Sequence, residues 1–178
     1  MGGEKMKIYI FAILLIACIV STSYAQRLFG LLTSGPGSGA QVFWQDVVHL
    51  AFALSGNKDG VDLIVANMLT AAELWNLMEA VFSRAGPGNI CLFVFSGHGA
   101  QVPDVNGDEA DGTDGLIFHG TPILDDFFVN FFTRLPLPMT ETVLVFDSCH
   151  SGDMEDAATA NIASVLTSCT DSQKVAYF

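Results

Sequence analysis

Two short apolar stretches with the same kind of ending restrict what this chain can fold into. Residues 90–95 read I-C-L-F-V-F and run into S-G-H-G at 96–99; residues 143–146 read V-L-V-F and run into D-S-C-H at 147–150. Continuous apolar runs of this length are typical of strands that are buried on both faces of a parallel sheet. Because ligands gather beyond the carboxyl ends of such strands, we expect both polar segments at one sheet edge.

The two polar segments carry the residue types of nucleophilic catalysis. A cysteine attacks well only as a thiolate, and a nearby histidine can activate it. The two residues of such a pair are separated in sequence and meet in the fold, so we select His98 and Cys149 as candidate catalytic residues. His150 is the weaker candidate, because neighbouring side chains of an extended chain point to opposite faces. The same alternation places Asp147 with Cys149, and Ser96 with His98.

The rest of the chain alternates between strand-like and helix-like segments, which predicts an α/β fold with a mostly parallel central sheet flanked by helices. Thr70 and Glu73 form a capping box at the start of one helix. The other predicted elements are strands at 27–33, 61–66, 116–118 and 162–166, and helices at 44–54, 70–84 and 125–135. Residues 153–159 are typical of an acidic loop or a helix start.

Residues 1–25 have the features of a secretory signal peptide. Lys5 and Lys7 give a positive start, residues 8–20 are apolar, and Ser23-Tyr24-Ala25 supplies small residues for cleavage. We therefore expect a secreted or secretory-lumen protein, with one domain at 26–178 and no stable membrane span after cleavage. An uncleaved signal anchor is the alternative.

Charge and cysteine content narrow the function further. A formal charge of -12 argues against a nucleic-acid partner, which needs a basic surface. Cys91, Cys149 and Cys169 are an odd number in the mature chain, so at least one thiol is not paired within it. For Cys91 and His49 we expect only ordinary packing or surface roles, and for His119 a polar loop surface.

Four segments together resemble the metacaspases, which are caspase-like cysteine peptidases. They are F-S-G-H-G-A-Q (95–101), N-G-D-E-A-D-G-T-D (106–114), I-L-D-D-F (123–127) and F-D-S-C-H-S-G (146–152), and the resemblance extends from about residue 28 to the end. It implies a caspase-like sandwich and a cysteine endopeptidase that cleaves a peptide or protein substrate after Arg or Lys. His98 and Cys149 would form the catalytic dyad, and the chemistry would require no cofactor.

The resemblance also implies which residues surround the dyad. Backbone N–H groups of Gly99 and Cys149 would hold the oxyanion, and Asp147, Ser96 and Asp46 would line the pocket for a basic side chain. For Asp46 the match is to a loose N-D-[VA] pattern. A solvated acid in the first helical turn is its alternative.

A calcium site is the third implication of the resemblance, because many metacaspases bind this ion through scattered aspartates. By position these would be Asp114, Asp125, Asp126 and Asp156, with Ca²⁺ as an activator. Gly115 departs from the family, which has an acidic or amide residue there. The acidic loop at 104–114 lacks the glycine and the glutamate of an EF-hand, and a solvated loop is the alternative.

The end of the chain and the remaining motifs leave other hypotheses open. Metacaspases continue with a helix and a strand beyond the position of Phe178, so we expect that the last C-terminal elements are lacking and that a missing segment or a second chain associates with the domain. A legumain-like peptidase that cleaves after Asn is the near rival, since residues 45–52 resemble that family, but its early Arg has no counterpart between Leu28 and Arg84. A non-catalytic caspase-like binding module and a calcium-binding protein with vestigial motifs are the others.

Overall fold

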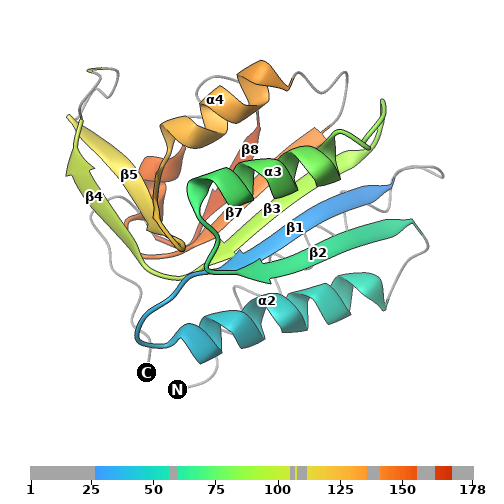
Figure 1. The fold of residues 1–178 in the computed structure, drawn as a ribbon, viewed down its shortest axis with the longest axis horizontal. Helices are drawn as coiled ribbons and strands as arrows, with labels where there is room; N and C mark the ends of the chain where they lie inside the picture. The colour runs from blue at the N-terminus through green and yellow to red at the C-terminus, as the bar shows by residue number, and fades with distance from the viewer. Residues whose placement is uncertain are drawn as a thin grey trace.

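The computed structural model describes residues 27–56, 60–104, 107, 112–135, 141–155 and 163–169. The predicted signal peptide and Asp156 lie outside these residues. The main sheet has five strands in the order β2-β1-β3-β7-β8 (Figure 1), and every neighbouring pair is parallel. The strands are β1 (Leu28–Ser34), β2 (Val61–Asn67), β3 (Ile90–Ser96), β7 (Glu141–Asp147) and β8 (Ser164–Thr167). The predicted parallel sheet is thereby confirmed.

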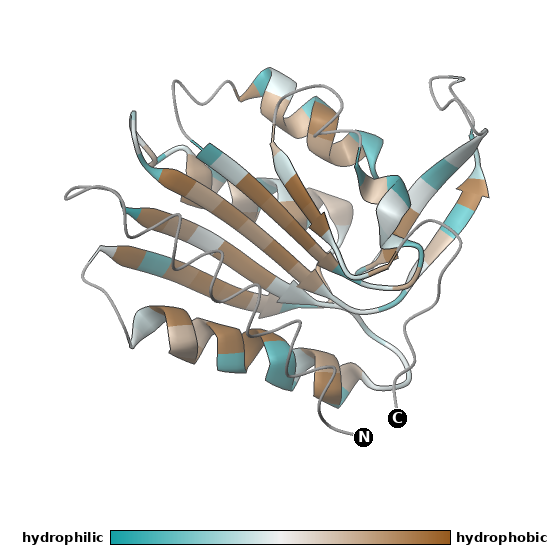
Figure 2. Ribbon diagram, turned by 180° about the vertical axis from the view of Figure 1, so that it is seen from behind, coloured by the Kyte–Doolittle hydropathy of each residue, from teal (hydrophilic) through white to brown (hydrophobic). Residues whose placement is uncertain are grey.

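Helices cover both faces of this sheet. Helix α2 (Ala40–Ser55) lies on one face, and α3 (Ala71–Phe82) and α4 (Asp126–Arg134) lie on the other (Figure 1). Alternate side chains of β3 point to opposite faces of the sheet. Leu92 packs in the hydrophobic cluster on the α2 side, and Phe93 packs in the cluster on the side of α3 and α4. This double burial is why the central strands are apolar along their whole length (Figure 2).

Aromatic side chains fill the core between the sheet and α4. The ring centroids of Phe93, Phe128 and Phe146 lie 5.0 to 5.8 Å apart, within the range of favourable edge and offset contacts. Trp75 of α3 meets Phe131 of α4 at 4.9 Å. The crowded aromatic face of the predicted helix is therefore core and holds the two helices to the same face.

A small antiparallel sheet follows His98 directly. Its strands are β4 (Gly99–Pro103), β5 (Thr113–Phe118) and β6 (Pro122–Leu124), in that order across the sheet. The sequence indicated only the end of β5, because glycine, glutamine and proline in β4 and the three residues of β6 carry little strand signal. In Figure 1 the yellow hairpin of β4 and β5 projects at the carboxyl edge of the main sheet.

The helix starts agree with the sequence to different degrees. The capping box is confirmed, since the Thr70 N–H donates to Glu73 Oε2 at 2.8 Å and the Glu73 N–H donates to Thr70 Oγ1 at 3.3 Å. Helix α2 begins at Ala40 rather than at residue 44, after Gly39 with a left-handed φ of 87°. Where an acidic loop or helix start was expected, the described part is a 3₁₀ turn, η1 (Ser151–Met154).

His119 is not on the surface, so that expectation was wrong. Its side chain is only 2% exposed, and its Nδ1 accepts a hydrogen bond from the Leu69 N–H at 2.7 Å. The Gly120 N–H donates to the Leu69 carbonyl at 2.6 Å. These bonds fasten the β5–β6 turn to the loop between β2 and α3. Burial lowers the pKa of His119 from its ordinary 6.5 to about 4.

This buried histidine should make the protein less stable in mild acid. Between pH 6.5 and about 4 the unfolded chain takes up a proton at His119 that the folded chain does not, so the stabilisation is complete above pH 6.5 and is lost as the pH falls. The loss is on the order of 3 kcal/mol. Urea unfolding at several pH values should show it against His119→Asn, which keeps a hydrogen-bond acceptor near the Leu69 N–H but does not titrate. Parallel pH curves for the two proteins would contradict this role.

Candidate active site

The pairing of β3 with β7 brings the two sequence motifs together. Ser96 is opposite Asp147 in the parallel register, and the Gly97 N–H donates to the Asp147 carbonyl at 3.1 Å. His98 and Cys149 each follow from these neighbouring strand ends. The expectation that both polar segments reach one edge of the sheet is confirmed.

The loop between β1 and α2 holds the His98 ring. His98 Nε2 donates a hydrogen bond to the Ser38 carbonyl at 2.9 Å, and the ring lies edge-on to Phe43 at a centroid distance of 5.1 Å. A Cβ at Gly37 would come within 3.1 Å of the imidazole Cδ2. Since Nε2 carries the proton given to Ser38, the other ring nitrogen, Nδ1, is the one available as a base.

Sequence reasoning missed these partners of His98. Residues 34–40 have only the composition of a loop, and Phe43 lies just before the helix that the sequence predicts at 44–54. Ser38 acts through its main-chain carbonyl, which any residue type supplies. The one signal was the density of glycine, because Gly37 and Gly39 have φ values of 104° and 87°, which other residues rarely adopt.

Cys149 differs from the other two cysteines that the structure describes. All three are free thiols, but Cys91 and Cys169 are buried whereas Cys149 is partly exposed. Burial raises the pKa of Cys91 to about 12. Burial and then the charge of the nearby Cys149 raise the pKa of Cys169. Of these three thiols, therefore, Cys149 has the environment best suited to reaction with a substrate.

The first residue of β4 packs tightly against the nucleophile loop. A side chain at Gly99 would overlap the carbonyl oxygen of Cys149 and would lie 2.8 Å from Ser148 Oγ. Only glycine fits here without moving the backbone of Cys149. The main chains of Gly99 and Cys149 are thus close together, as an oxyanion site shared by the two would require; that site itself stays a prediction.

Two of the three predicted pocket residues lie together. Ser96 Oγ donates to Asp147 Oδ2 at 3.3 Å, beside the strand ends that lead to the dyad. The carboxylate of Asp147 is half-buried. Asp46 lies on α2 within one helical turn of Phe43, the residue that contacts His98. Whether Asp46 lines the same pocket stays a prediction.

The predicted calcium ligands are partly engaged within the protein. Asp114 and Asp125 are both 3% exposed, and Asp125 uses its two oxygens to accept the N–H groups of Gly115, at 2.6 Å, and Asp126, at 2.8 Å. Within the described parts of the chain, no three His, Cys, Asp or Glu residues are grouped so that they could hold a metal ion. The carboxylates fit calcium in donor type, but with Asp156 outside the described residues the full set stays a prediction.

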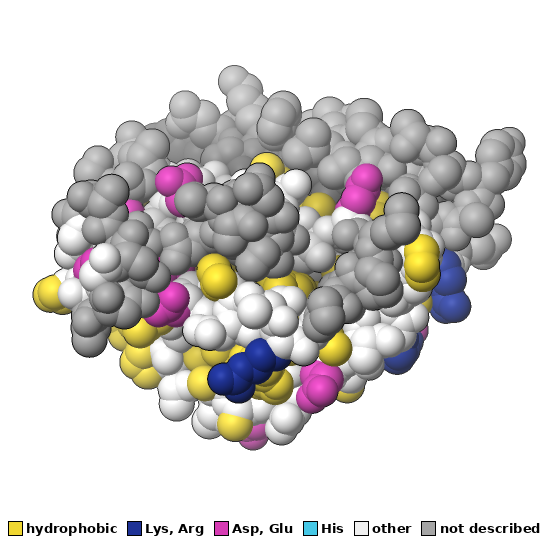
Figure 3. Space-filling view, turned by 90° about the horizontal axis from the view of Figure 1, so that it is seen from above, with side chains coloured by type: hydrophobic (Ala, Val, Ile, Leu, Met, Phe, Trp, Pro, Cys, Tyr) yellow, Lys and Arg dark blue, Asp and Glu magenta, His cyan; other side chains and the backbone are white. Residues whose placement is uncertain are grey.

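Among the described residues, no helix is long and apolar enough to cross a membrane. On the face shown in Figure 3, the coloured residues include no continuous basic patch.

Comparison with known proteins identifies the family. Residues 43–158 match the model of the metacaspase, peptidase C14 domain, and this range contains His98, Cys149 and the acidic loop. The chain belongs to the metacaspase family. The match covers about two thirds of the 178 residues, so the predicted caspase-like α/β sandwich is confirmed together with the family.

Individual metacaspases show how much of a relative this chain represents. It is 36% identical over 92 residues to Metacaspase-1B of Aspergillus fumigatus, covering 49% of this chain and 22% of that protein. It is 31% identical over 137 residues to Metacaspase-1 of Saccharomyces cerevisiae, covering 74% of this chain and 29% of that protein. The chain therefore spans less than a third of the length of these curated relatives.

A solved structure supports the fold independently. The crystal structure of protein GSU0716 from Geobacter sulfurreducens superimposes with a TM-score of 0.55, over 77% of this chain and 57% of that one. The sequences share 22% identity, so the similarity concerns the arrangement of the backbone.

The tight contact at Gly99 gives a testable expectation for this metacaspase domain. Gly99→Ala should lower the free energy of unfolding by about 1–3 kcal/mol, since the added methyl group forces the Cys149 loop to move. Gly86→Ala is the matched control, because its nearest neighbour, Asn89 Nδ2, would be 3.7 Å away; its effect should stay within about 0.5 kcal/mol. Chemical denaturation measures both, and equal effects would rule out a special constraint at Gly99.

Proposed function

We propose that this metacaspase domain is a cysteine endopeptidase that cleaves after Arg or Lys, with Cys149 and His98 as its catalytic dyad. The strongest support is that β3 pairs with β7 and brings the two motifs together. The Gly97 N–H donates a hydrogen bond to the Asp147 carbonyl, and Gly99 packs against the backbone of Cys149. Neighbouring strand ends thus bring a partly exposed thiol and an oriented imidazole to one edge of the sheet.

In the proposed reaction, His98 Nδ1 takes the proton of Cys149, and the thiolate sulfur attacks the scissile carbonyl carbon. The carbonyl oxygen becomes an oxyanion, which backbone N–H groups of Gly99 and Cys149 stabilise. The C–N bond then breaks as His98 returns its proton to the leaving amine. Water adds to the thioester, the acid product leaves, and Cys149 regains its proton. The Ser38 carbonyl keeps the ring oriented through its bond to Nε2.

Asp147 and Ser96 supply the proposed specificity for a basic residue. Asp147 is half-buried, so its charge is screened less by water than that of a fully exposed acid. The bond from Ser96 fixes one carboxylate oxygen. A guanidinium or ammonium group placed before the scissile bond would find a fixed anion next to the nucleophile.

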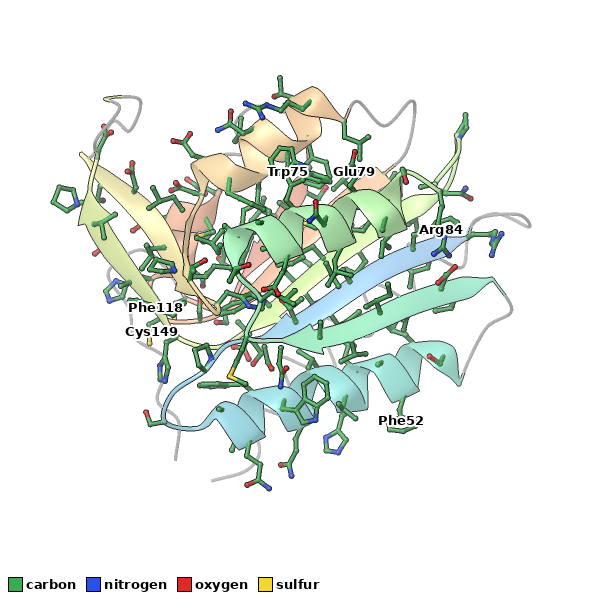
Figure 4. All side chains as sticks on the ribbon, in the orientation of Figure 1. Phe52, Trp75, Glu79, Arg84, Phe118 and Cys149 are labelled. Carbon is green, nitrogen blue, oxygen red and sulfur yellow. The ribbon has the colours of Figure 1, made fainter. Side chains whose placement is uncertain are left out.

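The arrangement of the arginines favours this specificity over the legumain-like alternative. Arg27 and Arg84 both lie over the ring of Phe29, at 5.2 and 5.5 Å from its centroid, and Arg84 forms an ion pair with Asp62. These residues are at the amino ends of the strands, and Figure 4 shows Arg84 at the opposite end of the sheet from Cys149. Neither arginine can therefore bind a substrate asparagine beside the dyad.

The pocket assignment predicts a selective loss of activity. Asp147→Asn should lower kcat/KM for Arg and Lys peptides by at least roughly 30-fold, because a desolvated cation loses its anionic partner. A panel of fluorogenic peptides with Arg, Lys, Asn or Asp before the scissile bond measures this. Glu79→Gln, which removes an exposed acid on α3 (Figure 4), is the charge-matched control and should leave the rate unchanged.

The same panel separates the rival functions. Cys149→Ala should abolish turnover, and full turnover in that variant would exclude the dyad. Cleavage after Asn would favour the legumain-like hypothesis. If every peptide stays intact and iodoacetamide labels Cys149 no faster than Cys91, the domain is a non-catalytic module instead.

For calcium, we infer a site that includes Asp114, with Asp125, Asp126 and Asp156 as the other ligands, and an activating role. The support is the donor type and the burial of Asp114 and Asp125. When bound, the ion would neutralise the crowded carboxylates and order the segments that carry them.

The secretory location and the association with a further segment or chain also stay predictions.

Calcium should therefore stabilise the protein without any substrate present. At ten times its Kd, the ion adds about 1.4 kcal/mol, or roughly 3–6 °C in Tm. Thermal unfolding with and without calcium measures the shift, with magnesium as the competing ion. Asp114→Asn should remove the shift and Glu79→Gln should keep it; a shift that survives Asp114→Asn would place the ion elsewhere.

A further inference from the structure

Four large apolar side chains are exposed in the part of the chain that the structure describes: Val42, Phe52, Met68 and Phe118. Single exposed apolar residues are common and do not by themselves indicate a binding site. Phe118 differs from the others in its position, because it is the last residue of β5 and its N–H bonds to the carbonyl of His98. Figure 4 shows it at the same edge as Cys149, whereas Phe52 lies at the far end of α2.

The small sheet places Phe118 directly beside His98. Ile117 pairs with Gly99, and the Phe118 N–H donates to the His98 carbonyl at 2.9 Å. His98 and Phe118 are therefore opposite each other across the two strands, and opposite residues project from the same face. Ile117 projects from the other face and is fully buried in the core. Phe118, which is 38% exposed, projects away from the core.

The backbone on both sides of Phe118 is fixed. Its carbonyl oxygen packs against Gly35, where a Cβ would overlap it. The next residue, His119, is held by its bond to Leu69. An aromatic ring on a fixed backbone loses little conformational entropy when a ligand covers it, which makes such rings effective binding contacts.

Met68 brings a second exposed apolar side chain to the same turn. It is 54% exposed and has a φ of 49°, in the left-handed region that residues other than glycine rarely adopt. Its carbonyl oxygen lies against Gly120, where a side chain would overlap it. Strained backbone of this kind persists only where the surroundings hold it, and it is concentrated at binding and active sites.

We propose that Phe118 is the apolar contact for the substrate residue that follows the scissile bond, with Met68 of the adjoining loop as a second contact. This rests on the proposed peptidase function. His98 protonates the leaving amine, so the first residue of the leaving peptide begins at His98, and Phe118 is the neighbour of His98 across the small sheet. The residue before the scissile bond lies toward Asp147 and Ser96, on the main-sheet side of His98. The enzyme should thus prefer an apolar residue directly after the basic one.

Internally quenched peptides test this preference, because they carry natural residues on both sides of the cleaved bond. The set has Arg before the bond and Gly, Asp, Leu or Phe after it. The wild-type protein should cleave the Leu and Phe peptides roughly tenfold faster, in kcat/KM, than the Gly peptide. Phe118→Ala should remove most of this advantage, because it lowers the rate on the Leu and Phe peptides more than the rate on the Gly peptide.

Phe52→Ala is the matched control, since it removes the same ring from an exposed site far from the dyad. It should retain the full preference. Met68→Ala should reduce the preference in part. Wild-type cleavage after Arg with no preference for an apolar following residue would overturn the role of Phe118 and leave the peptidase function standing. An equal loss of rate on all four peptides in Phe118→Ala would overturn it too.

A binding measurement tests the Phe118 contact even if the protein shows no turnover. Two fluorescein-labelled peptides are used, one with Arg-Leu and one with Arg-Gly. Each is titrated with the Cys149→Ala protein and with the two double variants that add Phe118→Ala or Phe52→Ala. Tighter binding of the Arg-Leu peptide that is lost with Phe118→Ala and kept with Phe52→Ala supports the contact. Equal affinities for the two peptides would contradict it. Failure of the peptidase function alone would show as binding without cleavage by the wild-type protein.

Discussion

The parallel pairing of β3 with β7 is the interaction on which the rest of the site depends. It fixes Ser96 opposite Asp147, so the polar residues that follow both strands emerge at one edge. The pairing is stable because the apolar residues of both strands are buried on two faces, under α2 on one side and under α3 and α4 on the other. A shift of one residue would exchange the buried faces of β7, so the core that stabilises the protein also sets the register of the dyad.

The small antiparallel sheet also borders the site. Because β4 starts at Gly99, its first residue lies against Cys149, and its partner β5 ends beside His98. The buried His119 then fastens the end of β5 to the loop after β2. These contacts connect the edge of the main sheet, the β4–β5 hairpin and the loop that carries Cys149. Backbone packing therefore sets the positions of His98 and Cys149.

The sequence predicted the parts of this structure that depend on long apolar runs or on a specific side chain. The buried strands, the capping box at Thr70 and the arrival of both polar segments at one edge of the sheet belong to this group. It did not predict β4, which has few strand-forming residues, or β6, which has only three residues. It also misjudged His119, since nothing local shows that a histidine after a strand will find the N–H of Leu69, distant in sequence, and become buried.

The contacts that orient His98 show why sequence motifs predict only part of the candidate site. The ring is held by the main-chain carbonyl of Ser38 and by the edge of Phe43, and neither contact is visible in a sequence pattern. What the sequence must supply is a loop that turns the carbonyl toward the ring, which the positive φ values of Gly37 and Gly39 permit. A main-chain acceptor is neutral, so it fixes the tautomer and adds no negative charge beside Asp147. The glycine-rich loop is therefore as much a part of the proposed machinery as the two residues that perform the chemistry.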